Sequence, residues 1–381
     1  MRITWEYQRL SEGIRILRAW GEAECLTVPE ILEGLPVTEI GPYAFSTAEL
    51  PRRLKEKEGE RRRTVEEGTN LIEEPGNPVA GNRLQAIRLP ASVQVIGDYA
   101  FYGCLELKEI AFADSMKRIG SGAFMGCRNV DRLELEERGT GENTLYQMLS
   151  ELRYTIEVII RRSEGSTVLI LPEYYESSVE NIPARILELH YQGTGYRYRQ
   201  CFRNGIIDYR EYDRLFGLAE SQEPPEVLTR LAYNRIQYPE GLSEEAKGTY
   251  LEWIGANVRE AGNYFLKRDD LPAIRLLCEA GGFNGTAKDK KKEPGTGEGK
   301  RVVADGAGDF YMASMGEHIL GEAELEPGEG KKSSGEEESS RASLDILLEM
   351  AGHMGRTEIV SYLMDYRYRK QGGRKKKVFD L

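Results

Sequence analysis

A repeat of 23 residues near the N-terminal end constrains the fold of this chain more than any other feature. VQVIGDYAFYGCLELKEIAF (residues 93–112) is followed by MKRIGSGAFMGCRNVDRLEL (residues 116–135). The equivalent positions are Ile96 and Ile119, Gly97 and Gly120, Phe101 and Phe124, Cys104 and Cys127, and Ile110 and Leu133. Stacked units of ~20–29 residues, none of which buries its apolar face alone, form a solenoid.

Apolar and polar residues alternate in one short piece of each unit, namely IRLP (87–90), EIAF (109–112) and RLEL (132–135). This period of two residues predicts one strand per unit, and the strands together predict a parallel sheet along one face. We expect Phe45, Phe101 and Phe124 to stack as an aromatic spine. Gly103 and Gly126 suit turns with a positive φ angle.

An earlier copy of the unit, VTEIGPYAF (37–45), is separated from these two by an insertion at residues 51–83. The insertion contains RRLKEKEGERRR and EEPGNPVAGN, and its charges, prolines and glycines predict a surface loop. The units and the insertion together define a first domain at residues 1–136.

The pattern IG-x-x-AF-x-GC-x-x-L-x-x-I-x-LP resembles the BspA-like (Treponema-type) leucine-rich repeat of bacteria, over about residues 14–135. LTVPEILEGLPVTEIGPYAF (26–45) resembles the way such arrays begin. The L-x-x-L-x-L-x-x-N run of commoner leucine-rich repeats is missing, so no asparagine ladder is expected. The resemblance implies a horseshoe-like binding module, of a kind often displayed on bacterial surfaces.

Helical spacing of apolar residues appears near the C-terminal end, in LPAIRLLCEAGG (271–282) and LLEMAGHMGRTEIVSYLMDY (347–366). These pieces resemble degenerate ankyrin helical pairs, and the stretch at 243–267 completes the stack. An insertion at residues 284–342 is rich in Gly, Ser, Lys and Glu and is expected to be disordered. This domain spans residues 218–381 and ends in a basic tail, residues 367–381.

Residues 137–217 connect the two arrays. TIEVIIRR and TVLILPEYYE predict a strand pair, ARILELHYQGTGYRYRQCF predicts a second strand pair, and IDYREYDRLFGLA predicts a helix. The predicted fold class is therefore an α+β repeat protein. It consists of a short leucine-rich β-solenoid, a middle α/β segment and a C-terminal ankyrin-like α-helical stack.

Composition narrows the function classes. A net charge of −11 and a pI of about 5.2 argue against a general nucleic-acid binder. Three histidines are few for catalysis, and no nucleophile, metal or phosphate-loop motif is found, so neither enzymatic activity nor a cofactor is expected. An enzyme hidden in residues 137–217 is an alternative. No apolar run has the ~18 residues of a membrane span or the form of a signal peptide, which predicts a cytoplasmic location.

Five cysteines without a C-x-x-C spacing predict free thiols. Cys104 and Cys127 occupy equivalent places in neighbouring units, so a disulfide between them is within geometric reach. Small buried residues are the preferred interpretation of both.

The strand residues that point away from the core are the candidate contacts for an unidentified protein partner. They are Arg88, Glu109, Arg132 and Glu134. An ordinary solvated face is the alternative interpretation of the same four side chains. The predicted function is a non-enzymatic protein–protein interaction adaptor or scaffold that binds through its leucine-rich and ankyrin-like surfaces.

A nucleic-acid-associated protein is the alternative function. Tyr196, Arg197, Tyr198 and Arg199 combine rings that stack on bases with cations that neutralise phosphate. In a strand the two tyrosines would share one face and the two arginines the other, with the tyrosines packed inward and the arginines solvated. The basic tail would add further phosphate contacts.

Overall fold

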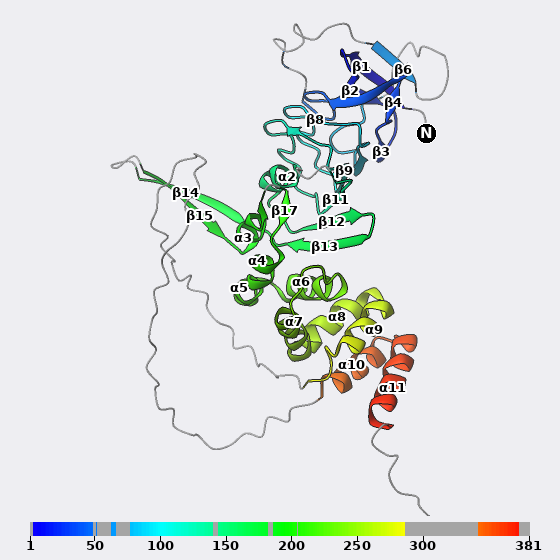
Figure 1. Cartoon of the computed structure of the whole chain (residues 1–381), viewed down its shortest axis with the longest axis vertical. Coiled ribbons are helices and arrows are strands. Elements are labelled where there is room, and N and C mark those ends of the chain that lie inside the picture. The colour runs from blue at the N-terminus through cyan, green and yellow to red at the C-terminus, as the bar shows by residue number, and fades with distance from the viewer. Residues whose placement is uncertain are drawn as a thin grey trace, which may run out of the picture.

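The computed structural model describes residues 3–48, 51, 62–65, 77–139, 144–181, 186–203, 205–285 and 342–372. Strands form the N-terminal part, a mixed segment follows, and helices form the C-terminal part. The three parts follow one another along the long axis of the molecule, which is elongated (Figure 1). The buried apolar residues of all three parts belong to one continuous core.

A six-stranded sheet runs along the solenoid in the order β13-β12-β11-β9-β7-β3. Its strands are β3 (Cys25–Thr27), β7 (Ala86–Arg88), β9 (Glu109–Ala113), β11 (Arg132–Glu136), β12 (Ile156–Arg162) and β13 (Gly165–Leu171). The pairs from β3 to β12 are parallel, and β13 closes the sheet as an antiparallel strand. Ile110 pairs with Leu133, which is the register that the repeat predicts.

A second sheet lies on the other side of the coils, in the order β10-β8-β5-β2-β1-β6, with β4 paired to β5. Its strands are β1 (Thr4–Arg9), β2 (Ile14–Trp20), β4 (Ile31–Leu32), β5 (Leu35–Ile40), β6 (Arg62–Val65), β8 (Val95–Ile96) and β10 (Arg118–Ile119). The prediction of one strand per unit is therefore wrong, because each unit adds a second, short strand to this sheet. Strands of two residues are too short to show a period in the sequence.

The aromatic spine is confirmed. The ring of Phe101 stacks on those of Phe45 and Phe124, with centroid distances of 5.1 and 5.3 Å. Gly103 and Gly126 have φ angles of 74° and 87°, as predicted for the turns after the phenylalanines. The register between neighbouring coils is thus fixed by identical side chains at equivalent positions.

The repeated glycine of the IG pair has a steric cause. A Cβ atom on Gly97 would lie 2.5 Å from the backbone nitrogen of Pro42 in the preceding coil, and one on Gly120 would lie 2.4 Å from that of Asp98. Real side chains do not approach backbone so closely, so only glycine allows the coils to stack at this spacing.

The structure bears on two sequence predictions about loops and tails, and it leaves most of a third outside the described residues. The insertion at residues 51–83 is not a loop throughout, because β6 pairs with β1 and extends the second sheet. The first part of the predicted basic tail, residues 367–372, is helical, because α11 (Thr357–Gly372) continues through it, and residues 373–381 lie outside the described residues. Of the predicted disordered insertion, residues 286–341 also lie outside them.

The middle segment contains α2 (Leu145–Glu151), β14 (Tyr175–Asn181), β15 (Ile186–Gln192), α3 (Gly195–Gln200), β16 (Phe202–Arg203), β17 (Ile206–Ile207), α4 (Tyr209–Arg214) and α5 (Phe216–Gln222). The strand pair β12–β13 is confirmed and prolongs the solenoid sheet. The second predicted pair is wrong, because β15 pairs with β14 and the following residues form α3. The hairpin β14–β15 projects from the body (Figure 1).

The described residues after α5 form six helices, which are α6 (Pro225–Gln237), α7 (Glu244–Ala256), α8 (Val258–Arg268), α9 (Leu271–Ala280), α10 (Ser343–His353) and α11. The predicted helical pairs are found, with α8 packed on α10 and α9 on α11. Arg356 donates a hydrogen bond of 2.8 Å to the carbonyl of Leu266, which fastens one pair to the other. The helix α6 packs against β13 and so joins the helical half to the solenoid sheet.

The cysteines allow a direct check of the coil packing. Cys104 and Cys127 are buried, and their thiols donate to the carbonyls of Phe45 and Phe101 at 3.2 Å each, which confirms their interpretation as small buried residues. Cys201 and Cys278 are also buried, and burial raises the pKa of Cys278 to about 12. Cys25 is exposed.

We therefore expect an aromatic disulfide reagent at pH 8 to label one thiol per folded chain, at Cys25, because the other four thiols are buried and shielded from the reagent. Cys25→Ser should remove this fast reaction, and denaturant should then release the other four thiols. Fast labelling of Cys104 or Cys127 in the native state would contradict the coil packing.

Candidate functional site

The four residues predicted to point outward do lie together on the outer face of the six-stranded sheet. Arg132 faces Glu109 across the β9–β11 pair, at 3.9 Å. Arg88 lies 3.5 Å from Glu134. These side chains therefore bind one another across the strands. The assignment of a protein partner to them stays a prediction.

Glu134 is the most constrained of the four, with 7% of its surface exposed. Its carboxylate also accepts a hydrogen bond of 2.6 Å from Arg161 on β12. Burial opposes the ionisation of Glu134, but the hydrogen bond and charge of Arg161, together with Arg88, outweigh it and lower the pKa of the carboxyl. Beyond this point α6 covers the sheet, where Arg230 lies 3.5 Å from Glu157. Only part of the sheet face is thus open to a partner.

The strand predicted for the Tyr/Arg segment is a helix, α3, and this changes the accessibility of its side chains. Tyr198 and Arg199 are both buried, whereas a strand would have placed all four residues alternately on two faces. Tyr196 is half-buried and stacks on Tyr191 at 3.9 Å. Only Arg197 is exposed, so the four residues do not form a surface for nucleic acid.

Arg199 instead binds the backbone. Its guanidinium donates six hydrogen bonds of 2.6–3.1 Å, which end on the carbonyls of Leu149, Leu152, Tyr154, Pro172 and Gly195. It also lies over the ring of Tyr174, 4.9 Å from the centroid. Burial lowers the pKa of Arg199 to about 10. This side chain ties the end of α2, the end of β13 and α3 into one unit.

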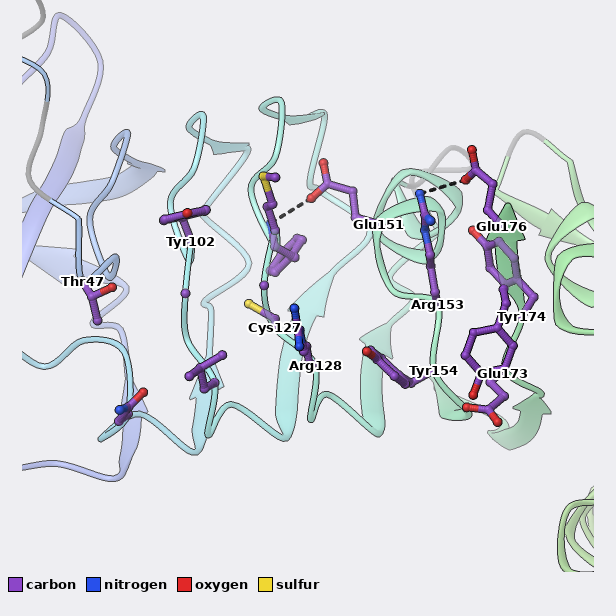
Figure 2. A pocket seen from close by; sticks show the side chains of 17 residues that line it. Thr47, Tyr102, Cys127, Arg128, Glu151, Arg153, Tyr154, Glu173, Tyr174 and Glu176 are labelled. Carbon is purple, nitrogen blue, oxygen red and sulfur yellow. Dashed lines mark hydrogen bonds and ion pairs between the residues drawn. The ribbon is translucent and has the colours of Figure 1, made fainter. Parts of the chain in front are cut away.

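A hollow lies on another side of the coils, along the turns that follow the phenylalanines. Its volume is about 800 Å³, and we call it the tyrosine groove (Figure 2). Its lining residues are Thr47, Asn82, Tyr102, Gly103, Leu105, Phe124, Met125, Gly126, Cys127, Arg128, Glu151, Arg153, Tyr154, Glu173, Tyr174, Tyr175 and Glu176.

Large apolar side chains are exposed along this groove to an unusual extent. The exposed fractions are 37% for Tyr102, 43% for Leu105, 56% for Met125, 40% for Tyr154 and 57% for Tyr175. A cluster of exposed apolar side chains marks an interaction surface, whereas scattered ones do not. Sequence reasoning missed this site, although Tyr102 and Met125 occupy the variable place in AF-x-GC, where a small or polar residue would suffice.

Glu151, at the end of α2, closes the stack of coils beside the groove. The backbone N–H groups of Phe45 and Phe101 each donate to a carbonyl of the following coil, at 2.8 Å. No coil follows Phe124 at this place, and its N–H donates at 2.8 Å to the Glu151 carboxylate instead (Figure 2). The carboxylate thus replaces the missing carbonyl, as a buried N–H requires.

The far end of the groove is polar. Arg153 pairs with Glu176 at 2.9 Å and lies over the ring of Tyr174 (Figure 2). The hydroxyl of Tyr175 is hydrogen-bonded to the Glu173 carboxylate. This bond and the negative charge of Glu173 raise the pKa of Tyr175. The described residues provide no cation for Glu173 and no carboxylate for Arg128 within ion-pair distance. These two charges remain available to a ligand.

Within the described part of the chain, no three side chains of His, Cys, Asp or Glu gather as metal ligands would. None of the described helices combines the length and apolar character that a membrane crossing requires. The site is therefore defined by exposed aromatic and aliphatic side chains with a few charges.

Parallel coils with a phenylalanine spine and a sheet along one face make the N-terminal part of the chain a β-solenoid. Residues 80–156 match the family described as BspA type Leucine rich repeat region (6 copies), which confirms the resemblance for this segment. The comparison with curated proteins gives no match.

Two solved structures show some similarity. One is a leucine rich cell surface protein from Faecalibacterium prausnitzii A2-165, with 14% identity, a TM-score of 0.22 and coverage of 44% of this chain and 59% of the other. The second is a T. pallidum Leucine Rich Repeat protein, with 21% identity, a TM-score of 0.18 and coverage of 37% of this chain and 73% of the other. The chain thus spans 59% of the length of the first of these proteins.

Proposed function

We propose that this protein is a non-enzymatic protein–protein interaction adaptor or scaffold and that the tyrosine groove is its main contact surface. The observation that carries the proposal is the group of exposed apolar side chains along the groove, from Tyr102 to Tyr175. Proteins of the leucine-rich repeat class commonly bind other proteins, and aromatic side chains and methionine are enriched at such interfaces.

The outer sheet face is a second, smaller contact surface in this proposal. Arg88 is half-exposed there, but Glu134 is buried and ion-paired, so that a partner would have to break existing pairs. The groove therefore offers more free energy per contact, because its apolar side chains lose only water on binding.

We also propose that the helical pairs are degenerate ankyrin-like repeats and that the protein works in the cytoplasm. Support for the first point comes from Leu277 and Leu363, which occupy equivalent places in α9 and α11 and are both fully buried. Support for the second comes from five cysteines without a disulfide, a usage typical of reducing compartments.

The test uses the immobilised full-length chain in a nuclease-treated lysate of its source cell, with the bound proteins identified by mass spectrometry. We expect a discrete protein that the wild type and an Arg88→Ala/Arg132→Ala control retain. A Leu105→Asp/Met125→Asp variant should lose it, because two buried carboxylates in the interface cost several kcal/mol.

Loss of the protein from the sheet-face control alone would move the contact to the six-stranded sheet. Recovery of the protein from an untreated lysate but not from the nuclease-treated one would contradict the adaptor proposal. Circular dichroism of each variant shows whether the fold is retained.

A further inference from the structure

The tyrosine groove crosses successive layers of the solenoid. Thr47, Tyr102, Cys127, Glu151 and Glu173 come from consecutive layers and follow one another along it (Figure 2), and Met125 lies in the same turn as Cys127. Neighbouring strands lie ~4.8 Å apart, so four steps give a length of about 20 Å. An extended peptide rises ~3.3 Å per residue, and about six residues fill that length.

The two ends of the groove differ chemically. Around Leu105 and Met125 the exposed surface is apolar, and it suits an aliphatic or aromatic side chain. At the other end Glu173 lies near the exposed ring of Tyr154 (Figure 2) and is hydrogen-bonded to the exposed Tyr175. A carboxylate beside tyrosine rings is suited to a lysine or arginine, which gains both an ion pair and a cation–π contact.

The balance of charge favours a basic partner. Glu151, Glu173 and Glu176 line the groove with only Arg128 and Arg153, and Arg153 is already paired with Glu176. The whole chain carries a net charge of −11, which adds attraction at long range. A nucleic-acid phosphate would be repelled by this negative charge.

We propose that the tyrosine groove binds an extended segment of a partner protein that places an apolar side chain over Leu105 and Met125. A lysine or arginine about four residues away contacts Glu173. Arg128 lies between the two ends and donates to the carbonyls of the bound backbone. This inference rests on the proposed function, because it specifies the partner for the same groove.

A phage-displayed library of random peptides, selected on the immobilised full-length protein, tests the proposal. We expect enriched peptides with an apolar residue and a basic residue at this spacing. Selection on Glu173→Lys should replace the basic residue by Asp or Glu. A peptide selected on the wild type should bind Glu173→Lys at least about tenfold more weakly, as loss of a charge pair at an interface predicts.

Glu252→Lys is the matched control, because Glu252 is an exposed carboxylate on α7, outside the groove. It should leave peptide affinity unchanged, whereas Met125→Asp should weaken every selected peptide. Enrichment without a preference for lysine or arginine, or equal binding to Glu173→Lys, would overturn this inference and leave the adaptor proposal standing. Equal enrichment on Met125→Asp would overturn the assignment of the groove itself.

Discussion

Arg199→Ala should destabilise the protein by about 4–5 kcal/mol, near the upper end for a single substitution. The change removes six hydrogen bonds and leaves five backbone carbonyls without their donor in a buried site. Urea denaturation, followed by circular dichroism, measures the loss. Because two of these carbonyls belong to Tyr154 and Pro172, the far wall of the tyrosine groove should loosen as well.

Two variants make this test specific. Arg197→Ala, in the same helix but exposed, should change the free energy of unfolding by less than about 0.5 kcal/mol. Arg199→Lys keeps the charge but has three donors on one atom instead of a planar fork, so it should lose a large part of the stability. Equal stability of Arg199→Lys and wild type would show that charge alone matters at this position.

Asp213→Ala is the second large effect, and we expect a loss of about 3–5 kcal/mol. Asp213 on α4 accepts hydrogen bonds of 2.8 and 3.1 Å from Arg235 on α6, and one of 2.8 Å from the hydroxyl of Tyr250 on α7. Burial lowers the pKa of Arg235, but Asp213 outweighs it and raises the pKa above its usual value. Without Asp213 a fully buried guanidinium would lack a counter-charge.

Asp365→Ala is the control for this pair, because Asp365 forms an exposed ion pair with Arg369 on α11. It should cost at most about 0.5 kcal/mol. The double variant Asp213→Leu/Arg235→Met should regain much of the lost stability, since apolar residues can replace a buried pair at little cost. The denaturation midpoints of the three variants measure these differences. A double variant as unstable as Asp213→Ala would show that apolar residues do not replace the buried pair.

The sequence was most informative where neighbouring residues alone determine the structure. Strand β9 was predictable because Ile110 and Phe112 alternate with Glu109 and Ala111, and the parallel register followed from the 23-residue spacing. Segment 195–200 misled, because Tyr196 and Tyr198 fit a period of two. The buried residues are Gly195, Tyr198 and Arg199, the spacing of one helix face.

The tyrosine groove could not be predicted from local pattern. Its lining spans residues 47 to 176, and it forms only when the coils stack and α2 lies against the last of them. The role of Glu151 likewise depends on its place beside the Phe124 N–H and not on any motif. The sequence does contain one indication of the groove, because Tyr102 and Met125 are large residues at turn positions where a small or polar residue would suffice.

At the end of the stack the Glu151 carboxylate accepts from the Phe124 N–H, while β12 continues the parallel sheet, so this architecture does not fix the number of coils. A duplicated 23-residue unit, added before α2, would present the same phenylalanine N–H to the same carboxylate. Each added unit would lengthen the tyrosine groove by ~4.8 Å, or about one and a half residues of extended ligand. The helix α2 can thus cap an array of any number of units. Gene duplication can therefore change the length of the groove by one unit at a time.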